Sequence, residues 1–255
     1  MLALRPLLSR LLILNKFKVK TKSITLISCL LISQQLSGMG LRSFVALPVD
    51  KGGTVLRFLM DYNFDTNTNV LNTSAAYGLS GTQTLLFGFP FRLSPSGDNR
   101  LNDFSALYRH TLVQTDTAAG TNRFAFLGGF IIPTDFDRDG GAQAGFVFTH
   151  FRGKHELDID ALYQKGFGNR AESGRFDISW QYRIKPKAFP EWGLYNEVYS
   201  VLEINGRWKQ GQTMSQQITA GMTWVNPKWV IEGGIVKEIN NQEDTHLVLS
   251  TRFHF

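Results

Sequence analysis

The chain has 255 residues, of which 27 are Lys or Arg, 21 are Asp or Glu and one is Cys. Residues 1–40 contain six of the basic residues and no acidic residue, which leaves 21 residues of each sign in the remainder. The net charge of +6 therefore does not favour nucleic-acid binding. Because the single cysteine, Cys29, also lies in residues 1–40, we expect no disulfide, no Cys/His metal site and no cofactor in the remainder.

Residues 1–40 have the features of a secretory signal peptide. Their basic stretch is followed by an apolar run, Ile24–Ser33, and then by small residues around Gly38–Gly40. The apolar run is shorter than the roughly 20 residues that a membrane-spanning helix needs. We predict a signal peptide over residues 1–40, with cleavage near residues 38–46. A lipoprotein site at Cys29 is disfavoured because the apolar run continues past it.

From Thr54 onward, short segments alternate between apolar and polar residues and are separated by turn residues. This period of two predicts β-strands, most of them with the roughly 9–11 residues that a tilted membrane strand needs. No window has a convincing helical period, and no apolar run approaches the length of a transmembrane helix. The predicted strands are residues 54–64, 68–77, 83–93, 102–113, 122–132, 142–151, 155–166, 174–184, 193–204, 213–225, 228–239 and 245–255.

The chemistry of the two strand faces favours a membrane barrel over a soluble sandwich. In residues 174–184, Phe176 and Ile178 share one face, whereas Asp177 and Ser179 share the other. The polar face carries charge in mid-strand, as a barrel lumen does, and the apolar face carries aromatic residues near its ends, as lipid interfaces do. The predicted interfacial aromatic residues are Tyr163, Tyr182, Trp192, Trp224 and Trp229.

The lengths of the connections between the predicted strands alternate along the chain. Short turns follow even-numbered strands and longer polar loops follow odd-numbered strands, which is the outer-membrane pattern if the chain starts in the periplasm. Two connections depart from it, a short one near Thr66 and a long one at 186–191. The predicted turns are 79–82, 152–154 and 226–228, and the predicted loops are 94–101, 133–141, 166–173 and 205–212.

The segment Thr245–Phe255 ends on an aromatic residue within a strand. In a soluble domain this edge would be ready to pair with other chains, whereas a closed barrel pairs it with the first strand, residues 54–64. The segment resembles the C-terminal strand of Gram-negative outer-membrane barrels, which implies an assembly signal read by the barrel-assembly machinery. We expect Leu247, Leu249, Phe253 and Phe255 to form this signal and meet lipid, and His246, Arg252 and His254 to face the lumen or the periplasmic rim.

Charged residues recur on the predicted lumen face, where they must pair or stay hydrated. One interpretation is a structural network that fills the interior. The other is a constriction that selects a small polar or aromatic solute, because lumen residues tune selectivity in such barrels. The candidates are Arg57, Arg109, Asp158, Asp160, Asp177, Arg183, Glu197, Glu203, Glu232 and Arg252, with Asp61 and Glu238 on the same face.

Residues Asp135–Gly140 match the first half of a calcium loop, D-x-D-x-D-G. The closing glutamate should fall at position 146, which is Phe146, and a strand rather than a helix follows. We therefore interpret the segment as a solvated extracellular loop and predict no metal. The alternative is a weak calcium or other divalent-cation site at Asp135, Asp137 and Asp139, or a contact with cations bound to lipopolysaccharide.

The sequence contains no recognised catalytic constellation. His246 and Ser250 lie about 13 Å apart along one strand face, too far for a Ser–His pair. No nucleophile elbow, H-E-x-x-H motif or glycine phosphate loop occurs. We do not expect an enzyme, and an outer-membrane hydrolase, the third hypothesis, would depend on His110, His150 or His155.

Several stretches resemble the transporter family of outer-membrane proteins named for the meta pathway of phenol degradation (MetA-pathway). The resemblance covers most of Ala46–Phe255, and one departure is Asn102, where the family's motif has Gly before Asp. It implies an outer-membrane β-barrel that transports small hydrophobic or aromatic compounds, and it supplies no catalytic residues. The matching stretches are Ala46–Arg57, Tyr77–Leu85, Asn102–Arg109, Arg175–Arg183 and Val201–Gly206.

We therefore predict an all-β chain in which residues 41–255 form one closed antiparallel transmembrane barrel of about 12 strands, with 10 or 14 as alternatives. The predicted function is that of a porin-like channel for a small solute in the outer membrane of a Gram-negative bacterium. The alternative is a structural or adhesive barrel with a plugged lumen. The expected partners are outer-membrane lipid, lipopolysaccharide, the barrel-assembly machinery and the solute, and nucleic acid is not among them.

Overall fold

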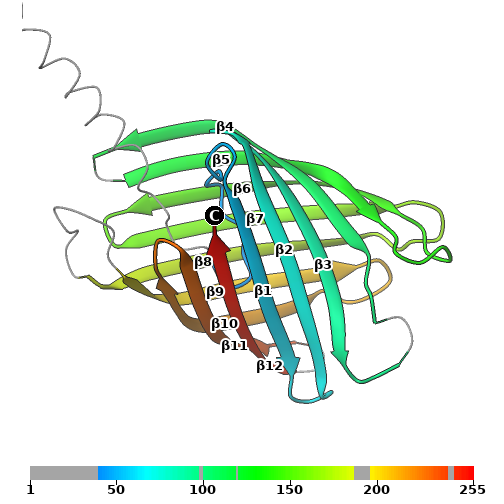
Figure 1. Ribbon diagram of the computed structural model, residues 1–255. Helices are drawn as coiled ribbons and strands as arrows, with labels where there is room; N and C mark the ends of the chain where they lie inside the picture. The colour runs from blue at the N-terminus through cyan, green and yellow to red at the C-terminus, as the bar shows by residue number, and fades with distance from the viewer. Residues whose placement is uncertain (1–39, 98–99, 119, 187–195, 241–243) are drawn as a thin grey trace, which may run out of the picture. The chain divides into compact units, whose positions relative to one another are not determined.

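The computed structural model describes residues 40–97, 100–118, 120–186, 196–240 and 244–255. These residues form twelve strands that close into one antiparallel barrel, in which each strand pairs with its neighbours in sequence and β12 pairs with β1 (Figure 1). The strands are β1 (Thr54–Asn63), β2 (Thr68–Ser80), β3 (Gln83–Ser94), β4 (Phe104–Thr117), β5 (Gly120–Ile132), β6 (Gly141–Arg152), β7 (His155–Gly166), β8 (Ser173–Lys185), β9 (Glu197–Lys209), β10 (Ser215–Val225), β11 (Trp229–Glu238) and β12 (Thr245–His254).

The predicted fold class and strand number are confirmed. The predicted partner of the last strand is also confirmed, because β12 pairs with β1 from Val55↔His254 to Asn63↔His246. Beyond the last ladder pair, the backbone N–H of Phe255 donates to the carbonyl of Thr54. In the part of the chain that the structure describes, no helix is long and apolar enough to cross a membrane.

One predicted loop was placed too early. Strand β9 continues through Lys209, so the loop predicted at 205–212 begins only at residue 210. Asn205 and Gly206 look like turn residues in the sequence, yet both are needed inside the strand. Asn205 is buried and donates to the carboxylate of Asp177 at 2.6 Å. A Cβ at Gly206 would lie 2.1 Å from the Phe176 ring, so this glycine makes room for an aromatic side chain.

The outer face of the barrel is apolar. Its strands expose large hydrophobic side chains at alternate positions, such as Phe126 and Phe130 on β5 and Ile204 on β9, whereas the intervening positions are buried inside. A water-soluble protein rarely exposes so continuous an apolar surface. Burying the polar positions and exposing the apolar ones is the arrangement of a barrel whose outer solvent is lipid.

Aromatic side chains gather near both ends of the strands. Tyr163 stacks on Trp208 at one end, with ring centroids 6.3 Å apart. At the other end Trp224 meets Trp229 edge to face at 4.9 Å. Tyr182 also lies at that end, in contact with the ring of His155. The remaining predicted interfacial residue, Trp192, lies outside the described residues.

The connections alternate between the two ends of the barrel as predicted. Consecutive strands are joined at one end, called here the turn end, by residues 81–82, 118–119, 153–154, 186–196 and 226–228. The opposite, loop end carries residues 64–67, 95–103, 133–140, 167–172, 210–214 and 239–244. The two predicted exceptions, the short connection near Thr66 and the long one after Lys185, are both present.

Residues 40–50, called here the inner segment, precede β1 and form no strand or helix. They lie inside the barrel, where Leu41, Val45 and Ala46 are buried against wall residues. The segment ends in a turn at which Gly52 has a φ of 79°, a value that favours glycine. The sequence did not predict this segment. Apart from Gly40, the predicted signal peptide, including Cys29, lies outside the described residues.

Candidate functional site

The barrel wall holds the inner segment mainly through the segment's backbone. The carboxylate of Glu203 accepts a hydrogen bond from Arg42 N at 3.1 Å, and that of Asp160 accepts one from Phe44 N at 2.7 Å. The Ala46 N–H donates to the hydroxyl of Thr149 at 2.9 Å. These three contacts come from β9, β7 and β6, so several strands of one side of the wall bind alternate residues of the segment.

Arginine side chains bind the carbonyl groups of the same segment. Arg109 donates to the carbonyls of Val45 and Leu47, each at 2.5 Å. Arg57 donates to the carbonyl of Leu41 at 2.5 Å, and Arg175 donates to the carbonyl of Arg42 at 3.3 Å. Charge-assisted hydrogen bonds of this kind satisfy backbone groups that would otherwise be buried without a partner.

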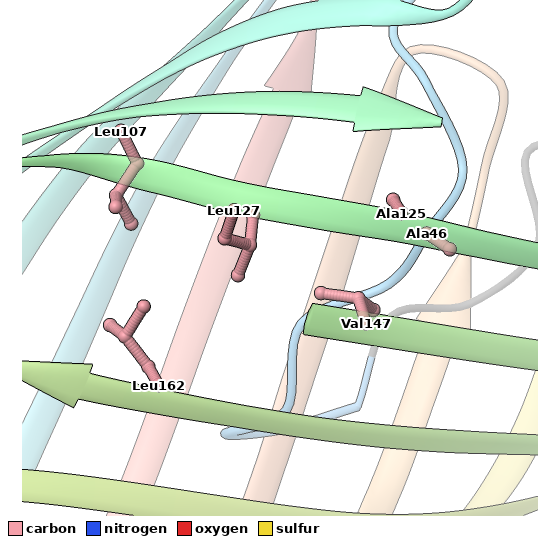
Figure 2. Close-up of a cluster of buried hydrophobic side chains, with 6 residues drawn as sticks. All are labelled: Ala46, Leu107, Ala125, Leu127, Val147 and Leu162. Carbon is pink, nitrogen blue, oxygen red and sulfur yellow. The ribbon is translucent and has the colours of Figure 1, made fainter. Parts of the chain in front are cut away.

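Two apolar side chains of the inner segment pack against the barrel wall. Leu41 fits against Gly221 of β10 and Gly234 of β11, where an added Cβ would lie 2.6 and 2.7 Å from the Leu41 Cδ1 atom. Ala46 packs in a buried cluster with side chains from β4, β5, β6 and β7 (Figure 2). Burying a leucine side chain contributes about 1.5–3 kcal/mol, so these contacts add to the hydrogen bonds. The cluster partners of Ala46 are Leu107, Ala125, Leu127, Val147 and Leu162.

Several charged side chains of the lumen form paired groups. Glu232 accepts hydrogen bonds from Arg57 at 3.0 Å and from Arg252. Asp177 accepts from Arg175 at 3.0 Å and from Arg207 at 2.6 Å. Buried charges are tolerated when they are paired and hydrogen-bonded, and removing one partner leaves the other as an uncompensated charge.

The other predicted lumen residues also lie inside the barrel. Asp158 accepts hydrogen bonds from Thr149 at 2.6 Å and from Gln181 at 3.1 Å. Arg183 lies 3.5 Å from Glu197, and Asp61 contacts His246 at 2.7 Å. The structure thus brings the sequence candidates together inside the barrel. Those at least nine-tenths buried are Arg109, Asp158, Asp160, Asp177, Arg183, Glu203, Glu232, Glu238 and Arg252.

Three arginines that pair with these interior acids were not among the sequence candidates. Arg175 and Arg207 lie at the loop ends of β8 and β9. The sequence could have identified Arg175 as a lumen residue, because it is two residues from Asp177 and therefore on the same strand face. Arg42 carries no such signal, since it lies in the inner segment, which has no strand period.

A cavity of about 550 Å³ lies in the loop half of the barrel. Its lining includes Leu41, Arg42 and Phe44 of the inner segment and, toward the loops, Asp103 and Arg170. Asp103 pairs with Arg170 at 2.5 Å and with Arg138 at 2.9 Å, so three loop-end connections are tied together there. The volume falls within the range of roughly 300–1,000 Å³ that is typical of small-molecule sites.

The last strand presents the two faces expected of it. Leu249, Phe253 and Phe255 are exposed on the outside, whereas Arg252 is buried inside, next to Glu232. Leu247 and His254 are half-buried. The role of the apolar face in assembly stays a prediction.

Most of the candidate metal and hydrolase residues contact other groups of the protein. Among the described residues, no group of three or more His, Cys, Asp or Glu side chains could hold a metal ion. Within the aspartate loop, Asp135 accepts a hydrogen bond from Asp137 N and Asp139 accepts one from Asn169 N. The three histidines considered for a hydrolase contact other side chains: His110 lies on Tyr108, His150 contacts Asn122 and His155 stacks on Trp180.

No protein-family model matches this sequence, and no curated protein matches it. Among solved structures, the chain is similar to the COG4313 outer membrane channel from Pseudomonas putida F1, with 14% identity, a TM-score of 0.53, and coverage of 87% of this chain and 100% of that chain. It is also similar to the KdgM porin, with 9% identity, a TM-score of 0.48, and coverage of 79% and 99%. At this identity, the first likeness shows that the fold is that of an outer-membrane barrel.

Proposed function

We propose that this protein is an outer-membrane channel for a small solute and that the inner segment restricts its lumen. The observation that carries the proposal is the cavity of about 550 Å³, which is enclosed by a barrel with an apolar outer face. The cavity reaches from the loop connections to the inner segment. A solute that crosses the barrel must therefore displace residues 40–50 or pass beside them.

The proposal extends to location and partners. The apolar outer face and the aromatic residues near both strand ends suit the outer membrane of a Gram-negative bacterium, with the turn end in the periplasm. Outer-membrane lipid and lipopolysaccharide would then surround the barrel, and the barrel-assembly machinery would bind β12. Membership in the transporter family named for the meta pathway of phenol degradation is part of this proposal, supported by the stretches quoted above and by the fold.

Planar-bilayer recording tests the proposal. The purified chain should give discrete conductance steps, and a variant lacking residues 41–47 should give larger steps, because the segment's backbone contacts to Glu203, Asp160 and Arg109 are lost with it. Absence of conductance in both proteins would contradict the channel function.

The same recording separates the second candidate, a structural or adhesive barrel with a plugged lumen. The hydrogen bonds from several strands to the inner segment favour this alternative. A permanent plug predicts no conductance from the whole chain under any applied voltage. Conductance only after deletion of residues 41–47 would therefore favour the plugged barrel over the channel.

A further inference from the structure

The lining of the lumen cavity divides into two chemically different parts. Leu107, Ile131 and Leu162, from β4, β5 and β7, contribute apolar side chains. The cationic side chains come from β1, β8, β9, the connection after β7 and the inner segment. These cationic residues are Arg42, Arg57, Arg170, Arg175 and Arg207, against two lining acids, Asp61 and Asp103.

Three of the arginines lie in front of the acids that pair with them, whereas Arg42 lies 3.8 Å from Asp61, and those two side chains are 18% and 16% exposed. Side chains of Arg175 and Arg207 remain 21% and 25% exposed, whereas Asp177, which binds both, is 0% exposed. Arg57 is likewise 16% exposed while its partner Glu232 is 0% exposed. A molecule in the cavity therefore meets guanidinium groups, with the carboxylates behind them. Because Coulomb energy falls with distance, the nearer cations dominate the field on such a molecule.

An aromatic ring adjoins this cationic part. The guanidinium of Arg175 lies over the Phe44 ring, 4.2 Å from its centroid. The contact with the ring and the pairs with Asp177 at 3.0 Å and Asp160 at 3.5 Å hold the guanidinium in place, and its side chain remains 21% exposed. Phe44 also packs against the apolar cluster around Ala46, so it joins the cationic and apolar parts of the cavity.

From this arrangement we propose that the cavity binds a small monocarboxylate with a compact apolar body, such as an aromatic acid. The carboxylate contacts the guanidiniums of Arg42 and Arg175, and the body lies against Leu107, Ile131 and Leu162. The proposal rests on the proposed function for passage of the solute, and binding at the site is measured separately from passage.

Other small solutes match only part of this lining. An amine would place its charge against guanidinium groups. An uncharged aromatic compound would use the apolar part and leave the cationic part without an anion, and inorganic phosphate would do the reverse. A carboxylate on an apolar body uses both parts, and this combination distinguishes it from the other three.

The test is equilibrium binding to the purified, folded full chain in detergent, with benzoate, benzyl alcohol, benzylamine and inorganic phosphate as probes. Benzoate should bind at least about tenfold more tightly than each of the others, because each wrong or missing charge costs on the order of 1.4 kcal/mol or more. The variants Arg175→Gln and Arg42→Gln should each weaken benzoate binding about tenfold and leave benzyl alcohol unchanged.

Arg42→Gln is the safer variant, because Arg42 lies outside every strand and its loss leaves the Asp177 pairs intact. The matched control is Arg152→Gln, which removes an exposed arginine at the turn end of β6 and should not affect binding. Equal binding of benzoate and benzyl alcohol would overturn the proposal, as would stronger binding of phosphate or unchanged benzoate binding in both cavity variants.

The result is distinguishable from a failure of the channel function. Benzoate binding without bilayer conductance would support the site and contradict the channel. Conductance with no preference for benzoate in the binding assay would support the channel and contradict the site.

Discussion

At the scale of single residues, the interior depends on a few carboxylates that each bind more than one cation or backbone group. Glu232 on β11 pairs with Arg57 on β1 and with Arg252 on β12. The two arginines lie directly opposite each other in the β1–β12 ladder. The sequence could place each of them on the inner face from the strand period alone. It could not pair them, because the pairing depends on the stagger between strands, which no local pattern encodes.

The residue-scale prediction concerns Glu232. The variant Glu232→Ala leaves two arginines without their shared carboxylate, so we expect the barrel to lose about 3–5 kcal/mol of stability. The measurement is the temperature at which the fast-migrating folded form disappears from a gel run without boiling. Glu172→Ala serves as the control because Glu172 pairs with the exposed Lys165, a contact worth about 0–1 kcal/mol. Equal shifts in the two variants would show that the buried triad does not stabilise the barrel.

At the scale of elements, the strands were predictable and the inner segment was not. Alternation identified all the strands that the structure describes, since one face of each meets an apolar environment. The inner segment has no period, and its contacts to Glu203, Asp160 and Arg109 are made by backbone atoms. Backbone atoms are the same for every residue type, so the sequence of such a segment carries little information about where it binds.

The element-scale prediction concerns the end of β12. Phe255 and Thr54 exchange backbone hydrogen bonds of 2.9 and 3.0 Å where the barrel closes. We expect deletion of Phe255 to lower the amount of folded protein in the outer membrane severalfold, while the molecules that do assemble keep their conductance. Phe255→Trp, which retains an aromatic side chain, should assemble close to normally. Normal membrane levels of the shortened chain would mean that the terminal aromatic residue is not an assembly signal.

At the scale of the whole molecule, the barrel combines an apolar outer face with a charged interior that contains the inner segment. The sequence predicted the barrel and a lumen lined by charge. The cavity could not be predicted from the sequence. Its walls include the inner segment and the loop connections joined through Asp103, and both are positioned by contacts between residues far apart in the chain.

The most direct test of the channel is to fix the inner segment and record conductance. Ala46 of the inner segment and Ala125 of β5 pack in the same buried cluster (Figure 2). We therefore choose a variant with both residues changed to cysteine, in a Cys29→Ser background, and record from molecules in which a disulfide between segment and wall has been verified. We predict low conductance in the oxidised protein and a severalfold increase after reduction, with no response to reduction in either single-cysteine variant. The same conductance before and after reduction of a confirmed disulfide would contradict the account in which the inner segment is displaced to open the lumen.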